Sequence, residues 1–246
     1  MLSRDFFKIN YLGMRKFIIA LFFVTLIPTV SYSQGFTPPR FVIGATADGL
    51  FAVHDAYGTD FGAVDRTYGM MWGRGGTIYG KLGLGMRGNH KITLSAGYSK
   101  FINSGASSKT FFEQNPKAGL QTNYNIWSGS LGYEYTFNAR CRNKQFIGIA
   151  GTFNLINAQP GAFDFDDAIR IGVQGTAGYE IVLDNNFDYG LLFMFKYHML
   201  NVFNTENGIH KMNDGTGTPG PGWWRRVGTI SLHLGFNFYL GTRQIK

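Results

Sequence analysis

The sequence predicts an all-β fold, an eight-stranded antiparallel up-and-down transmembrane β-barrel, and three observations support this prediction. Residues 227–240 alternate apolar with small polar side chains over about eleven residues, roughly the length of a tilted strand that crosses a bilayer. Charged residues make up only 15% of the chain, against a usual share of about 25%. Beyond the N-terminal segment, no stretch approaches the ~20 apolar residues of a membrane-spanning helix. The apolar side chains are therefore expected on the lipid-facing side of each strand.

Residues 1–33 are predicted to be a secretory signal peptide. Arg15 and Lys16 precede an apolar run over residues 17–27, which is followed by Pro28 and by small residues up to Ser33. This run is too short for a membrane anchor helix. Translation starts at Met1 or at Met14, and residues 34–246 are predicted to form one barrel domain.

Eight segments are predicted as strands because apolar and polar side chains alternate along them between clusters of turn residues. In chain order these segments are Phe41–Val53, Thr77–Met86, Lys91–Phe101, Asn123–Phe137, Gln145–Leu155, Ile169–Leu183, Phe187–Leu200 and Val227–Leu240. Short connections over residues 87–90, 138–144 and 184–186 alternate with longer ones. An even number of strands places both chain ends on the side of the short turns, as in bacterial outer-membrane barrels. The termini are therefore predicted to be periplasmic and the long loops to lie at the cell surface.

Glycine and aromatic residues are distributed as such a barrel requires. Strand glycines gather on the face expected to point inward, with Gly80, Gly129, Gly151 and Gly175 as outward exceptions. Small residues relieve crowding there, because eight strands enclose just enough space for side chains. Aromatic residues near the strand ends predict two girdles at the membrane interfaces. These residues are Tyr133, Tyr135, Phe137, Tyr189, Phe236 and Phe238 on the short-turn side, and Trp127, Trp223 and Trp224 on the long-loop side.

From Phe41 to Leu240 the chain resembles the small outer-membrane barrels of the OmpA and OmpX type. The glycine-rich strands and the mature start at Gln34 are similar to the outer-membrane β-barrel domains of Bacteroidota. The resemblance implies that the last strand is read by the barrel assembly machinery through its aromatic residues, although residues 241–246 extend past it. It also implies a Gram-negative cell envelope, with outer-membrane lipid and lipopolysaccharide around the barrel.

Ionisable residues on the inward faces are predicted to fill the lumen as a network of ion pairs. Isolated buried charges are costly, whereas paired ones are tolerated and hold neighbouring strands in register. The predicted set is Lys81, Arg87, Glu134, Arg170, Glu180, Lys196, His198 and His233. The alternative interpretation is a gated water or ion path, which would make the barrel a narrow pore.

An outer-membrane lipid-modifying enzyme is a second alternative, because some small barrels carry deacylase or acyltransferase sites. Such chemistry requires a nucleophile within reach of a base. Ser231 lies two residues from His233 on the same inward face, a proximity that chance readily produces. No enzyme activity, catalytic residue or cofactor is therefore expected. A soluble lipocalin-like barrel is disfavoured, because the Gly-, Ser- and Thr-rich faces are poorly suited to bulk water.

Few other partners are indicated. Arg225 and Arg226 follow two tryptophans and would suit lipopolysaccharide phosphates, although a girdle with a charged rim explains them equally well. The acidic residues at 163–167 lack the spacing of a calcium loop, and the single cysteine, Cys141, offers no ligand pair, so no metal site is expected.

The net charge of +8 falls to +5, from 19 basic and 14 acidic residues, once residues 1–33 are removed. Without a basic run this charge indicates no nucleic-acid partner. The predicted role is structural or interactive, with the barrel acting alone or as a subunit of an envelope or secretion assembly.

Overall fold

The computed structural model describes residues 38–54, 56, 70–104, 121–160, 167–186, 188–202 and 227–241. The predicted signal peptide and Trp223, Trp224, Arg225 and Arg226 lie outside the described residues, as does most of the acidic segment at 163–167. The strands are β1 (Phe41–His54), β2 (Trp72–Leu84), β3 (His90–Ser104), β4 (Gln121–Phe137), β5 (Asn143–Pro160), β6 (Ala168–Val182), β7 (Tyr189–Met199) and β8 (Val227–Leu240). None of the described residues belongs to a helix that is long and apolar enough to cross a membrane.

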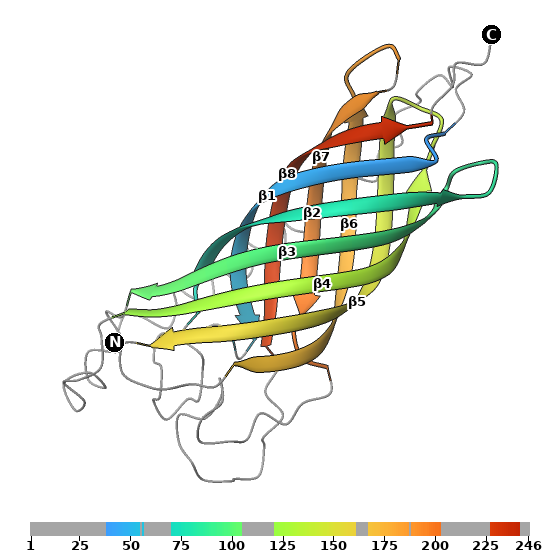
Figure 1. The fold of residues 1–246 in the computed structure, drawn as a ribbon. Helices are drawn as coiled ribbons and strands as arrows, with labels where there is room; N and C mark the ends of the chain where they lie inside the picture. The colour runs from blue at the N-terminus through green and yellow to red at the C-terminus, as the bar shows by residue number, and fades with distance from the viewer. Residues whose placement is uncertain are drawn as a thin grey trace, which may run out of the picture.

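The eight strands form one closed antiparallel barrel in chain order (Figure 1). Each strand pairs with its sequence neighbours, and β1 closes the ring on β8 through a register that runs from Phe41 opposite Leu240 to His54 opposite Val227. The short turns after β2, β4 and β6 lie at one end of the barrel, where β1 begins and β8 ends. We call this the turn end and the opposite one the loop end. The predicted up-and-down topology is confirmed.

Two strands differ most from their predicted boundaries: β5 (Asn143–Pro160) ends five residues beyond the predicted Leu155, and β2 is displaced at both ends. This strand begins at Trp72 rather than Thr77, since the glycine-rich residues 73–76 continue the pairing with β1. It ends at Leu84 rather than Met86, because Gly85 and Gly88 adopt positive φ angles of 70° and 64° and turn the chain toward β3. Glycine takes this conformation without the steric cost that a side chain would impose.

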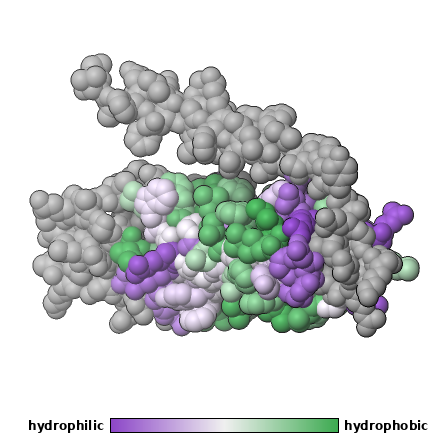
Figure 2. Space-filling model, turned by 90° about the horizontal axis from the view of Figure 1, so that it is seen from above, coloured by the Kyte–Doolittle hydropathy of each residue, from purple (hydrophilic) through white to green (hydrophobic). Residues whose placement is uncertain are grey.

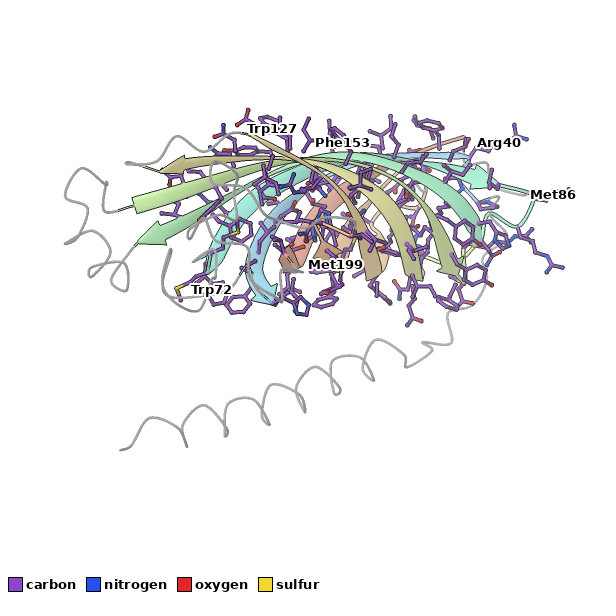
Figure 3. The ribbon with its side chains drawn as sticks, turned by 90° about the horizontal axis from the view of Figure 1, so that it is seen from below. Arg40, Trp72, Met86, Trp127, Phe153 and Met199 are labelled. Atoms are coloured by element: carbon purple, nitrogen blue, oxygen red, sulfur yellow. The ribbon has the colours of Figure 1, made fainter. Side chains whose placement is uncertain are left out.

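The outside of the barrel is apolar over its middle. Hydrophobic residues gather there in Figure 2, with hydrophilic residues toward both ends. In Figure 3, Trp127 and Phe153 project outward from the wall, while Met86 marks the turn end and Trp72 the loop end. Among the most exposed apolar side chains on the strands are Ile78, Leu94, Leu131, Ile149, Leu232 and Leu234. An apolar exterior of this size needs lipid rather than water around it, which rules out the lipocalin-like arrangement.

A charged side chain on the lipid-facing side is expected to destabilise the barrel. The loss should be larger the closer the residue lies to the middle of the bilayer. Leu131, near the middle of β4, is 63% exposed on the outer face. Leu131→Arg should cost about 2–4 kcal/mol of unfolding free energy in lipid vesicles, whereas Phe137→Arg, at the end of the same strand, should cost about 0–1 kcal/mol. Urea unfolding in vesicles measures both values. Equal costs at the two positions would contradict a bilayer centred on the apolar band.

Inside the barrel, glycines make room for large side chains from neighbouring strands. A side chain at Gly44 would meet the Tyr79 ring, one at Gly178 would meet the Phe146 ring, and one at Gly190 would meet the Tyr239 ring. By contrast, the outward Gly129, Gly151 and Gly175 face open space. The inward glycines therefore serve the packing of the lumen, in which the candidate functional site lies.

Candidate functional site

An ion-pair cluster centred on Lys81 lies toward the turn end of the lumen. Lys81 Nζ, on β2, lies 2.7 Å from Glu134 Oε2 of β4 and 2.7 Å from Glu180 Oε1 of β6. Lys91 Nζ of β3 lies 3.3 Å from Glu134 Oε1, and the Tyr239 hydroxyl of β8 donates to Glu180 Oε2 at 3.3 Å. All of these residues are buried. The cluster joins five strands through charge-assisted contacts, which tie their register together.

Aromatic rings enclose this cluster. Lys81 Nζ lies 4.3 Å from the centroid of the Phe146 ring, and Lys144 Nζ lies 4.3 Å from that of Tyr239. Tyr79, Phe146 and Leu192 form one buried apolar group, and Val42, Val182 and Tyr239 form another. The ring faces attract the lysine ammonium groups by cation–π interaction. Side chains therefore fill the turn end of the lumen.

A second polar group, centred on His233 of β8, lies further from the turn end. His233 Nδ1 lies 2.5 Å from Asp48 Oδ1 of β1, and His233 Nε2 lies 2.7 Å from Ser231 Oγ. A carboxylate only accepts hydrogen bonds, so Nδ1 carries the proton and, in the neutral imidazole, Nε2 accepts from the Ser231 hydroxyl. Thr46 and Thr77 donate to the two Asp48 oxygens at 2.5 and 2.6 Å. We call Asp48, His233 and Ser231 the relay.

The relay is fully enclosed. Ser231 is 2% exposed, and Asp48 and His233 are buried as well. Toward the loop end, His198 Nε2 lies 2.9 Å from Thr152 Oγ1, and Asn154 donates to the Leu200 carbonyl oxygen at 2.9 Å. Beyond these contacts a buried apolar cluster lies at the loop end of the lumen. It consists of Leu50, Ala52, Ala56, Met70, Phe101, Tyr124, Ile126, Ile156, Ala168, Leu200 and Val227.

The predicted lumen residues do not form one network. Lys81, Glu134 and Glu180 are in direct contact, whereas His233 and His198 belong to the polar groups nearer the loop end. Lys196 lines a cavity between the Lys81 cluster and the relay, and Arg170 lies near the loop end, where it donates to the Ile169 carbonyl oxygen at 2.8 Å.

Placing Arg87 in the lumen was wrong. This residue lies in the exposed turn after β2, which ends three residues earlier than an inward Arg87 would require.

Asp48, Lys91, Lys144 and Ser231 take part in the lumen without having been predicted as site residues. Each lies on the inward face, in step with polar residues that alternation does assign inward: Asp48 with Thr46, and Lys91 with Thr93. The strand pattern therefore carried a signal for their direction. It carried none for the partner of Asp48, which meets His233 only when β1 pairs with β8, whereas the proximity of Ser231 to His233 followed from their spacing.

The aromatic residues of the short-turn girdle that the structure describes lie on the outer face. Tyr189, Phe236 and Phe238 form a chain across β7 and β8, with ring centroids 6.1 and 5.1 Å apart. Tyr135 and Phe137 are similarly adjacent on β4, at 5.0 Å. Tyr133 is exposed beside His90, and Trp127 is exposed nearer the loop end. Their positions fit two interfacial levels on either side of the apolar band.

Eight antiparallel strands with an apolar exterior and a polar, filled lumen define the class: the chain has the fold of the small outer-membrane β-barrels. Among solved structures it is similar to Neisserial surface protein A, with a TM-score of 0.52 and 14% identity over 84% of this chain and 100% of that one. It also matches OprG from Pseudomonas aeruginosa (TM-score 0.48, 11% identity, 87% and 100% covered). A major outer membrane protein from Thermus thermophilus matches with a TM-score of 0.48 and 11% identity, over 80% and 98%. No protein-family model matches the sequence, and no curated protein matches it.

Proposed function

We propose that the protein is an integral outer-membrane barrel with a non-enzymatic structural or interaction role and a plugged lumen. The observation that carries this proposal is the combination of an apolar exterior with a lumen filled by the Lys81 cluster, the relay and the apolar cluster at the loop end. In this proposal, residues 1–33 are the signal peptide, the turn end and both termini face the periplasm, and the loop-end connections face outward. Binding then takes place at those connections rather than through the barrel.

The proposal includes three contacts. The aromatic residues of β8 would be read by the barrel assembly machinery, and Phe236 and Phe238 lie on its outer face as such a signal requires. Arg225 and Arg226 would contact lipopolysaccharide phosphates at the rim, since guanidinium groups pair well with phosphate. A protein partner in an envelope assembly would bind the loop-end connections.

Co-purification tests the interaction role. The native chain and a variant in which a short Gly-Ser linker replaces residues 203–226 are tagged at the C-terminus and recovered from native outer membranes in mild detergent. The strands are unchanged in both, and a heat-modifiable band on gels confirms folding. A partner should accompany the native chain and be lost with the variant. Recovery of the barrel alone from both samples would count against an interaction role.

A second candidate function, ester hydrolysis at Ser231, is favoured by the relay alone. The Ser–His–Asp order and the 2.7 and 2.5 Å contacts are those of a nucleophile, its base and the group that orients the base. Ser231 Oγ would attack an ester carbonyl carbon while His233 accepts the hydroxyl proton; the ester C–O bond would then break, His233 would return the proton to the leaving alcohol, and water would hydrolyse the acyl-serine. The enclosure of Ser231 opposes this role. A fluorophosphonate reagent that labels the folded barrel, but not the Ser231→Ala variant, would establish the candidate, and absence of label would remove it.

A further inference from the structure

A cavity of about 50 Å³ lies inside the barrel between the Lys81 cluster and the relay. Lys81 and Glu134 of the Lys81 cluster line this cavity. Thr77, whose hydroxyl group donates to Asp48 of the relay, lines it as well. A water needs about 10–15 Å³ by the same measure, so the cavity holds several water-sized species. Polar side chains line part of it, among them Lys196, Thr93, Thr176 and Gln174, so a water or an ion inside it would find hydrogen-bond partners.

Lys196 of β7 lines this cavity without a close counter-ion. No hydrogen-bond acceptor among the described residues lies within bonding distance of its Nζ, and no described carboxylate lies within 4 Å. In the register it stands between Thr176 of β6 and Ser231 of β8, well inside the barrel wall. Lys196 is half-buried and borders this interior cavity, so a species held in the cavity can compensate its charge.

Several other groups around the cavity can donate hydrogen bonds. Thr93 and Thr176 face it, and within the described structure their hydroxyl groups have no hydrogen-bond partner. Gln174 uses one amide hydrogen on Ser130 at 3.2 Å and keeps the second. The one carboxylate in the lining, Glu134, is already occupied by Lys81 and Lys91. The cavity therefore offers a cation and free donors, the chemistry that an anion requires.

The charge balance of the lumen agrees with this conclusion. Among the described residues, four lysines point inward, Lys81, Lys91, Lys144 and Lys196, against three carboxylates, Asp48, Glu134 and Glu180. Four positive charges against three negative ones leave an excess of +1, and Arg170 adds to it near the loop end. Glu134, Glu180 and Asp48 all make direct contacts with other partners, and the charge of Asp48 acts on Lys196 only from beyond 4 Å.

We infer that this cavity is a binding site for a small monovalent anion, chloride under physiological conditions. The anion pairs with the Lys196 ammonium and accepts hydrogen bonds from Thr93, Thr176 and Gln174. It offsets the charge of Lys196 and connects β3 to β7, which are not neighbours in the barrel. The site lies inside the plug, separate from the surface connections to which the interaction role is assigned.

The test compares the stability of the folded barrel in sodium chloride and in sodium gluconate at equal ionic strength, with urea as denaturant. At a chloride concentration ten times the dissociation constant, the folding equilibrium constant should rise roughly eleven-fold over gluconate. Lys196→Met should abolish this dependence and keep the fold, since it removes the uncompensated charge and preserves the length of the side chain. Lys100→Met, an equal charge change on the outer face of β3, should leave the dependence intact.

A second measurement covers the case in which Lys196→Met does not fold. Crystals of the native chain grown in bromide should show an anomalous peak in the cavity beside Lys196. The inference is overturned by an absence of chloride stabilisation in the native chain, by equal stabilisation in both variants, or by a cavity without a bromide peak.

Discussion

Replacing Lys81 with methionine is expected to destabilise the folded barrel by about 3–5 kcal/mol, the usual cost of removing one partner from a buried charge network. Lys81 is the only described residue in contact with both Glu134 and Glu180, each at 2.7 Å. Without it, Glu180 keeps the Tyr239 hydroxyl at 3.3 Å but loses its ion-pair contact. Urea unfolding in lipid vesicles, followed by tryptophan fluorescence, measures the loss.

The matched control for this prediction is the double variant Lys81→Met with Glu180→Gln. It removes the ammonium together with one carboxylate, so the charge left unpaired is smaller and part of the lost stability should return. A loss below about 1 kcal/mol in Lys81→Met, or no recovery in the double variant, would contradict a lumen held together by this cluster.

Valine at Gly178 is expected to cost at least about 1–3 kcal/mol, the usual penalty for overpacking a filled interior, and to slow folding into vesicles. A Cβ at this position would meet the Phe146 ring and would lie 2.5 Å from the Phe193 carbonyl oxygen. The backbone of β7 cannot move away from this Cβ without breaking its pairing with β6. Relieving the clash would therefore cost hydrogen bonds between the two strands.

Gly175→Val provides the control on the same strand. Gly175 points outward into open space, and valine favours a strand over glycine, so this variant should be as stable as the native chain or slightly more stable. The same unfolding measurement serves for both variants. Similar behaviour at the two glycines would show that the inward and outward faces of β6 are wrongly assigned.

The fold could be predicted from the sequence because alternation specifies two properties of a strand at once, its existence and its faces. The boundaries of β8 were predicted as Val227–Leu240 and are confirmed, since apolar and polar residues alternate throughout that strand. The start of β2 was missed because glycines at residues 73, 75 and 76 have no side chain to alternate. Arg87 lies outside the barrel because of the local geometry of the turn after β2. The alternation along the strand did not predict where that turn begins.

The lumen could be predicted only as a composition. Alternation assigns Lys81, Glu134 and Glu180 to the inside. Their contacts, however, depend on the relative stagger of β2, β4 and β6, and no two of these strands are neighbours in the barrel. The same holds for Asp48 and His233, which are 185 positions apart in the chain and meet through the closing pair of strands. The apolar cluster at the loop end was not predicted, because the apolar side chains of the strands had been expected mainly on the lipid-facing side.

Single-channel recording in planar bilayers tests the central claim, a lumen closed by its own side chains, most directly. The purified barrel in its native sequence should insert without producing conductance steps if the apolar cluster and the Lys81 cluster form the proposed plug. Conductance steps in the native chain, with an ion selectivity that changes in Lys81→Ala or Glu134→Ala, would contradict the plugged lumen and establish a narrow pore.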